Sequence, residues 1–349
     1  MSSLNIIEMS AVTDAKSRSD SARGVRTIQH EVPILAVIIG LLGATIWLLS
    51  GNSFALSVLS ITLLYAGLAT AWNIIGGLGG QFSIAHSVFF ALGAYVAGNL
   101  YIHWNVSPWI AIIPAAALAA TVGGLVSWPV FRLRGPFFAI ATMAMTEVAL
   151  AIAMYAEPLT GGAQGLTVPW RSGLQNMIFL NKWANALLFL GYLALTLGVM
   201  IAIARSKLGY YLQAVRDNQD AALASGIDVL KVKLTGMAIS AALTSVGGLA
   251  FMMYVRVVEP HGLLSLFDVG VKIALIALIG GLGTIYGPLL GAMLIIPLDY
   301  WLRAVIGSAV PGGGQIILGL VLILSAMFMK QGINGALKSV RSRLWRRSK

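Results

Sequence analysis

"VPILAVIIGLLGATIWLLSGNSFALSVLSITLLYAGLATAWNIIGGLGG", Val32 to Gly80, contains no charged side chain, and the run without Lys, Arg, Asp or Glu continues to Phe131. This length suffices for about four helical membrane crossings at about 20 apolar residues each. The whole chain is 58% hydrophobic and 10% charged, with a mean hydropathy of +0.87. These values lie outside the range of ordinary soluble domains. The sequence therefore predicts an all-α, polytopic membrane protein.

Hydropathy, together with Gly, Pro and charged residues as breaks, predicts about ten transmembrane helices. Their expected ranges are 33–50, 54–76, 81–103, 108–131, 137–156, 183–205, 233–256, 269–282, 286–306 and 314–330. Only "GGLGTIYGP", 280–288, divides the eighth from the ninth. That break is also compatible with a kink or a re-entrant turn, so the count stays open there.

The distribution of basic residues predicts the orientation, because cytoplasmic loops carry an excess of Lys and Arg. With the N-terminus inside, 18 of the 23 Lys and Arg residues fall on the cytoplasmic side. We therefore expect a cytoplasmic N-terminal tail over 1–31, a transmembrane domain over 32–331 and a basic cytoplasmic C-terminal tail over 332–349. This asymmetry also accounts for most of the net charge of +11. The basic tail is then expected to lie against anionic lipid headgroups, and nucleic-acid binding is not needed to explain it.

The densest mixed-charge stretch lies in the longest expected cytoplasmic loop, about 206–232. Leu208, Tyr211, Leu212 and Val215 have the spacing of one helical face, which predicts a short amphipathic helix. Arg216, Asp217 and Asp220 follow as a charged surface. The next residues have small side chains that would let another protein approach the backbone: Ala221, Ala222, Ala224, Ser225 and Gly226. The alternative is a helix on the membrane surface, which usually has a cationic polar face, whereas this one is mixed in sign.

Asp220, Ala221, Ala222 and Gly226 also occupy the positions of the Glu-Ala-Ala-x-x-x-Gly signature in the coupling loop of bacterial ATP-binding-cassette import permeases. "AVRDNQDAALASGIDVLKVKLTGMAISAALTSVGGLAF", 214–251, resembles the branched-chain amino-acid permeases of the LivM type within that superfamily. "GGLGGQFSIAHSVFFALGAYVAGNL", 76–100, "LTGGAQGLTVPW", 159–170, and "GGLGTIYGPLLGA", 280–292, resemble segments of the same family. Asp stands in place of the signature Glu, and the downstream Leu-Pro of many importers is absent, which weighs against a sugar permease.

The resemblance implies a type II-like importer permease fold and import of branched-chain amino acids across the bacterial inner membrane by alternating access. Urea, short amides or aromatic acids are alternative cargoes in the same family. The resemblance also implies three kinds of partner. These are a second permease subunit, either of the LivH type or another copy of this chain, two cytoplasmic ATPase subunits that use ATP and magnesium, and a periplasmic binding protein. The expected ATPase-coupling residues are Tyr211, Leu212, Val215, Arg216, Asp217, Asp220, Ala221, Ala222 and Gly226.

Several polar or glycine residues in the apolar segments are candidates for a translocation path: Gly79, Gly80, Gln81, Ser83, His86 and Glu147. Glycine breaks permit unwound helix where a cavity is lined, and the run 76–81 is the best such segment. His86 is either a hydrogen-bonded interhelical contact or a gate. Glu147 lies in mid-helix, where a charge costs about 2.5 to 3.5 kcal/mol, so we expect it to face the interior, pair or be protonated. Asp299 and Arg303, at i and i+4, are expected to pair.

The sequence contains no motif that would make this chain an enzyme. It lacks the P-loop pattern, H-E-x-x-H and G-x-S-x-G, so ATP hydrolysis must come from a separate subunit and no cofactor is expected on this chain. It has no cysteine, which excludes disulfides and thiolate metal sites, and no metal site is expected. The rival interpretations are a non-transporting membrane scaffold and an ion-coupled secondary transporter. The second needs several buried carboxylates, of which only Glu147 is well placed.

Overall fold

The computed structural model describes residues 33, 35–133, 135–306, 316 and 319–320. The chain divides into two units, 1–45 and 46–349. An apolar helix over Leu35–Leu48 begins in the first unit. The expected tails, 1–31 and 332–349, and almost all of the expected tenth crossing, 314–330, lie outside the described residues.

The described part of the second unit is almost entirely helical. Its α-helices are α2 Ser53–Asn73, α3 His86–Trp104, α4 Pro108–Val130, α5 Pro136–Tyr155, α6 Glu157–Thr160, α7 Lys182–Ala204, α8 Lys207–Asp217, α9 Gln219–Ala224, α10 Val229–Val255, α11 Pro260–Leu263, α12 Lys272–Gly280 and α13 Gly287–Ile306. Two π-helical segments, η1 Ile74–Leu78 and η4 Leu266–Val271, extend α2 and precede α12. Short 3₁₀ turns cover Gly162–Gln164 and Leu174–Asn176.

Seven segments among the described residues are long and apolar enough to cross a membrane. They are Ser53–Leu78, Pro108–Val130, Pro136–Tyr155, Lys182–Ala204, Val229–Val255, Pro260–Gly280 and Gly287–Val305. The all-α membrane architecture is therefore confirmed, whereas the count of about ten stays a prediction. The expected first crossing is the shorter helix Leu35–Leu48, and the expected third begins only at His86.

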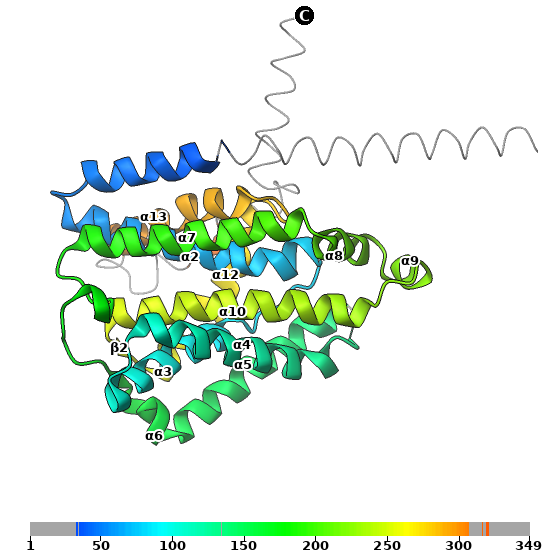
Figure 1. Ribbon diagram of the computed structural model, residues 1–349, viewed down its shortest axis with the longest axis horizontal. Helices are drawn as coiled ribbons and strands as arrows, with labels where there is room; N and C mark the ends of the chain where they lie inside the picture. Colours follow the sequence, from blue (N-terminus) through cyan, green and yellow to red (C-terminus); the bar gives the residue numbers. More distant parts are fainter. Residues whose placement is uncertain (1–32, 34, 134, 307–315, 317–318, 321–349) are drawn as a thin grey trace, which may run out of the picture. The chain divides into compact units, whose positions relative to one another are not determined.

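Helix α10 is the centre of the packing within the second unit. It packs extensively on α3 and α4, and it also contacts α2 and α7, while α2 packs on α7 and α13 (Figure 1). Glycines bring α3 and α10 together: a Cβ on Gly93 would collide with the carbonyl oxygen of Ser245, and one on Gly248 with that of Phe90. Small residues allow such backbone approach in apolar helix pairs.

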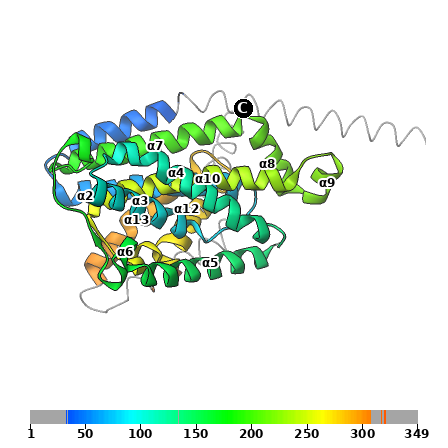
Figure 2. The same ribbon diagram turned by 60° about the horizontal axis from the view of Figure 1, so that its bottom comes forward.

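The two ends of this bundle differ in structure. Helices α8 and α9 project from one end (Figures 1 and 2). At the other end β1, Leu166–Thr167, pairs antiparallel with β2, Val257–Val258. This pairing ties the loop between α5 and α7 to the connection after α10. The expected outer loop and the expected cytoplasmic loop therefore lie at opposite ends, as the predicted topology requires.

The expected ion pair between Asp299 and Arg303 is present, with Arg303 Nε 2.8 Å from Asp299 Oδ1. Lys272 joins it, with its Nζ 3.1 Å from Asp299 Oδ2. Asp268 contacts both cations at 3.5 Å. The pair predicted from the spacing is thus half of a four-residue cluster that links η4, α12 and α13.

Candidate functional site

The expected coupling loop, 206–232, is an ordered pair of helices whose starts are capped by side chains. The Ser206 hydroxyl accepts from the Gly209 amide at 3.4 Å at the start of α8. Asn218 Oδ1 accepts from the amides of Asp220 and Ala221, each at 3.0 Å, at the start of α9. Asp228 Oδ1 accepts from the Lys231 amide at 3.1 Å before α10, and this hydrogen bond holds the pKa of the Asp228 carboxyl below its usual value. Such caps satisfy amides that a helix start leaves unpaired.

Gly226 ends α9 in a conformation that favours glycine. Its φ is +81°, its amide donates to the Leu223 carbonyl at 3.0 Å, and the next amide, of Ile227, reaches the Ala222 carbonyl at 3.1 Å. These two bonds form a Schellman motif, in which the left-handed residue is usually Gly. The last residue of the coupling signature therefore has a structural role in reversing the chain.

Part of the predicted coupling surface faces inward. Leu212 and Val215 are buried, which confirms an amphipathic α8, but Tyr211 is 37% exposed and does not share their buried face. Ala222, a residue of α9 itself, is also buried. The surface that α9 leaves free, which we call the hairpin tip, consists of Ala221, Leu223, Ala224, Ser225 and Gly226. Leu223, 49% exposed, is an apolar member that the sequence analysis did not single out.

A buried lysine fixes α9 to the bundle. Lys233, in the first turns of α10, is only 2% exposed, and its Nζ donates to Gln219 Oε1 at 2.9 Å. The same ammonium lies 5.8 Å from the centre of the Phe131 ring at the end of α4. The hydrogen bond links α9 to α10, the helix at the centre of the packing.

The predicted unwound segment is present, although shifted by a few residues. The α-helix changes to the π-helix η1 at Ile74, and residues 79–84 have no regular secondary structure. Gly80 has a φ of +66°. Side chains from other elements hold the segment: Trp72 Nε1 donates to the Ser83 carbonyl at 2.6 Å, and the Ile84 amide donates to Thr142 Oγ1 at 3.1 Å. Breaks of this kind occur in membrane proteins where backbone lines a path or is buried in protein.

Buried polar atoms gather where this segment enters α3. His86 Nε2 lies 2.8 Å from Ser240 Oγ on α10. Ser83 Oγ, His86 Nδ1 and Ser87 Oγ are buried and have no hydrogen-bond partner among the residues that the structure describes. Of the two expectations for His86, an interhelical contact is observed at Nε2, and Nδ1 leaves capacity for a further ligand. Gly79, Gly80, Gln81, Ser83 and His86 are thus neighbours along one interrupted helix.

Glu147 does not join this group. Its side chain is exposed on α5, and no hydrogen bond or ion pair reaches it from the described residues. It therefore neither faces the interior of the chain nor pairs, in contrast to two of the three expectations for it. The surrounding α5 surface is apolar and exposed, with Ile140, Val148 and Ile152 each more than half accessible.

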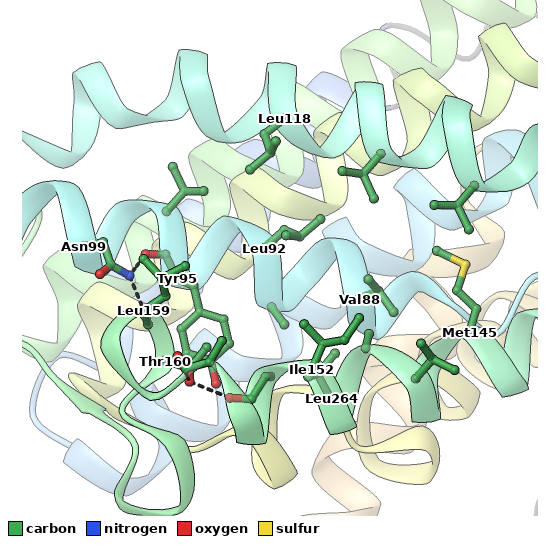
Figure 3. Close-up of a pocket in the computed structure, with 18 residues that line it drawn as sticks. Val88, Leu92, Tyr95, Asn99, Leu118, Met145, Ile152, Leu159, Thr160 and Leu264 are labelled. Carbon is green, nitrogen blue, oxygen red and sulfur yellow. Dashed lines mark hydrogen bonds between the residues drawn. The ribbon is translucent and has the colours of Figure 1, made fainter.

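A cavity of about 580 Å³ separates α5 from α3 and α4 (Figure 3). Val88 and Leu92 of α3, Leu118 of α4, and Met145 and Ile152 of α5 are among its apolar lining residues. At one end Asn99 Nδ2 donates to the carbonyls of Tyr95 and Leu159, at 2.8 and 2.6 Å. The cavity leaves α5 loosely packed against the rest of the second unit.

Sequence reasoning missed three polar residues that organise the site: Lys233 and Ser240, described above, and Asn73, whose buried amide bonds to the backbone of Gly283 and Thr284. Asn73 was detectable as an amide in an otherwise apolar span, where a polar side chain requires a partner. In the part of the chain that the structure describes, no group of three His, Asp or Glu side chains is placed to hold a metal ion.

Comparison with known proteins identifies relatives over most of the chain. The family model described as "Branched-chain amino acid transport system / permease component" matches residues 54–326. The high-affinity branched-chain amino acid transport system permease protein LivM of Escherichia coli is 24% identical over 88% of this chain and 75% of its own length. A probable branched-chain amino acid transport permease protein LivH of Methanocaldococcus jannaschii is 25% identical over 72% of this chain and 82% of its own. The fructose import permease protein FrcC of Rhizobium meliloti is 23% identical over 84% and 83%. No solved structure matches the chain.

Proposed function

This chain belongs to the family of branched-chain amino acid transport permease components, and from that premise we propose that it is the LivM-type membrane subunit of an ATP-driven importer. Its cargo would be a branched-chain amino acid, and its place the bacterial inner membrane with both termini in the cytoplasm. The complete importer would contain a LivH-type permease, two cytoplasmic ATPase subunits that use ATP and magnesium, and a periplasmic binding protein. The observation that carries the proposal is the ordered α8–α9 hairpin with its exposed tip.

The hairpin tip fits a protein docking surface better than a membrane-surface helix. Its small side chains at Ala221, Ala224 and Gly226 leave the backbone accessible, and Leu223 adds an exposed apolar contact. Interfaces commonly place such an apolar centre inside a polar rim, and Asp217 and Asp220 are exposed beside it. Docking alone does not drive transport. The ATPase must bind two states of the permease with different free energies, or it shifts no population between them.

The exposed Glu147 supports a permease partner along α5. A charged carboxylate facing lipid in mid-span costs about 2.5 to 3.5 kcal/mol on insertion scales. A neighbouring protein or a water-filled path removes that cost, and intramembrane ionisable residues commonly mark such paths. We therefore assign the Glu147 face of α5 to the boundary with the LivH-type subunit. The loosely packed α5 beside the cavity would then be the helix most able to move during alternating access.

Reconstitution tests this proposal directly. The chain would be assembled with its LivH-type, ATPase and binding-protein partners in proteoliposomes, and uptake of radiolabelled leucine measured with ATP or a non-hydrolysable analogue supplied to the ATPase side. We expect uptake only with ATP, and competition by isoleucine and valine. Competition by urea or an aromatic acid, but not by valine, would assign another cargo. Uptake that follows an ion gradient without ATPase subunits would refute the proposal.

A further inference from the structure

One arginine of α8 reaches past the docking surface into the helix break. The Nη1 atom of Arg216 donates to the Gly77 carbonyl at 3.0 Å. In an unbroken α-helix that carbonyl would accept from the amide of residue 81. Here the Gln81 amide bonds to the Ile75 carbonyl at 3.0 Å instead. Arg216 therefore takes the place of the missing helical bond, and its positive charge lies at a helix C-terminus, where the dipole favours a cation.

The Arg216 side chain fits against two glycines. A Cβ on Gly80 would lie 2.6 Å from Arg216 Cγ, and one on Gly283 would lie 2.9 Å from Arg216 Nη1. Both glycines have a left-handed backbone, with φ of +66° and +71°. Gly283 belongs to the break between α12 and α13. Arg216 thus contacts two interrupted helices that are more than 190 residues apart in the sequence.

Asn73 holds the same two breaks together. Its Oδ1 accepts from the Gly283 amide at 2.9 Å, and its Nδ2 donates to the Thr284 carbonyl at 2.9 Å. Asn73 is fully buried in the last turn of α2, immediately before η1. Both polar ends of its amide are therefore used to fix the α12–α13 break beside η1. We call Asn73, Gly77, Arg216, Gly283 and Thr284 the coupling node.

We propose that Arg216 is a positioning residue that transmits movement of the α8–α9 hairpin to the two helix breaks through the coupling node. This inference rests on the proposed function, in which the hairpin receives the ATPase. Leu212, one turn before Arg216, provides the contact about which α8 would tilt. Its Cδ2 would lie 3.1 Å from a Cβ on Gly79 and 3.1 Å from a Cβ on Gly236, so α8 packs directly against η1 and α10. A tilt of α8 about this contact moves the guanidinium and, with it, the Gly77 carbonyl at the entry to the unwound segment.

The test separates transmission from docking. Arg216→Ala would be assembled in the complete importer, with Arg216→Lys as the conservative variant and Arg132→Ala as the control. Arg132 is an exposed arginine at the same end of the bundle that stacks on Trp128 and takes no part in the node. Three quantities would be measured: ATPase co-purification, ATP hydrolysis and leucine uptake.

We expect Arg216→Ala to lower leucine uptake about tenfold, since a hydrogen bond to a charged group is lost, with ATPase binding retained and hydrolysis continuing. Arg216→Lys keeps a charged donor and should recover part of the uptake, and Arg132→Ala should match wild type. Wild-type uptake in Arg216→Ala, or loss of ATPase binding in step with uptake, would overturn the inference and leave the proposed function standing. If Arg216→Ala fails to insert into the membrane, Asn73→Leu is the second variant. Lowered leucine uptake with ATPase binding and ATP hydrolysis retained would support the coupling node, and wild-type uptake would refute it. Absence of ATP-driven uptake in wild type would instead refute the proposed function.

Discussion

His86 Nε2 and Ser240 Oγ lie 2.8 Å apart, and Ser240 Oγ also donates to the Ala71 carbonyl at 2.7 Å. The serine hydroxyl has one proton, which the bond to Ala71 uses. His86 must therefore donate through Nε2, and its buried Nδ1 is left as an acceptor with no partner in the described part of the chain. A single hydroxyl thus joins α2, α3 and α10 and fixes which ring nitrogen is presented beside the unwound segment.

Ser240→Ala is expected to lower the free energy of unfolding by about 1 to 3 kcal/mol, because it leaves a buried imidazole donor without its partner. Thermal unfolding of the purified chain in detergent measures the change. Thr235→Ala is the matched control, since Thr235 is exposed on the same helix and its hydroxyl donates to the Lys231 carbonyl of its own helical turn. Equal shifts for the two variants would show that the His86–Ser240 contact does not contribute to stability.

Gly93→Ala is expected to destabilise the bundle by about 1 to 3 kcal/mol or more, because the added methyl group collides with the Ser245 backbone and forces α3 away from α10. Gly198→Ala is the comparison, since a Cβ there meets nothing within 4 Å. In a helix Ala is favoured over Gly by about 1 kcal/mol, so this variant should be neutral or slightly stabilised. The folded yield and the melting temperature of Gly93→Ala and Gly198→Ala measure these two effects. Tolerance of Gly93→Ala would mean that the two backbones are not in contact.

Ala224→Trp is expected to reduce ATP-driven uptake about tenfold or more, because an indole on the hairpin tip obstructs docking without disturbing the chain reversal. The same substitution at Gly226 would combine bulk with strain at a φ of +81°. Gly226→Asn separates the two effects, since Asn tolerates the left-handed region, and it should retain most of the uptake. Normal ATPase co-purification with Ala224→Trp would contradict the assignment of the tip as the docking surface.

The sequence was sufficient for the features that depend on local pattern. The uncharged run from Val32 predicted membrane helices, and the i, i+4 spacing predicted the Asp299–Arg303 pair. Of the four residues in the predicted apolar face of α8, Leu212 and Val215 are buried, Leu208 is half-buried and Tyr211 is exposed. Each prediction follows from nearest-neighbour geometry on one helix or from transfer of apolar residues out of water.

Features that depend on contacts between distant segments were not predictable in the same way. No local signal shows that Arg216 replaces a backbone amide at Gly77, or that Ala222 of α9 is buried while its neighbour Leu223 is exposed. The expectation that Glu147 faces the interior assumed that one chain supplies its whole environment. Its exposed position in the second unit is understandable if a neighbouring subunit supplies part of that environment.

The most direct measurement of the central claim is the accessibility of a thiol on the hairpin tip. The chain has no native cysteine, so Ala224→Cys introduces a single reactive group, and Trp104→Cys, exposed at the opposite end of α3 from His86, is the control. The rate of reaction with a water-soluble maleimide would be measured with and without the ATPase subunits. We predict that the ATPases protect Ala224→Cys and leave Trp104→Cys unchanged. Equal labelling of Ala224→Cys in both conditions, in a complex that still transports leucine with ATP, would contradict the assignment of the α8–α9 hairpin as the site where ATP hydrolysis drives the permease.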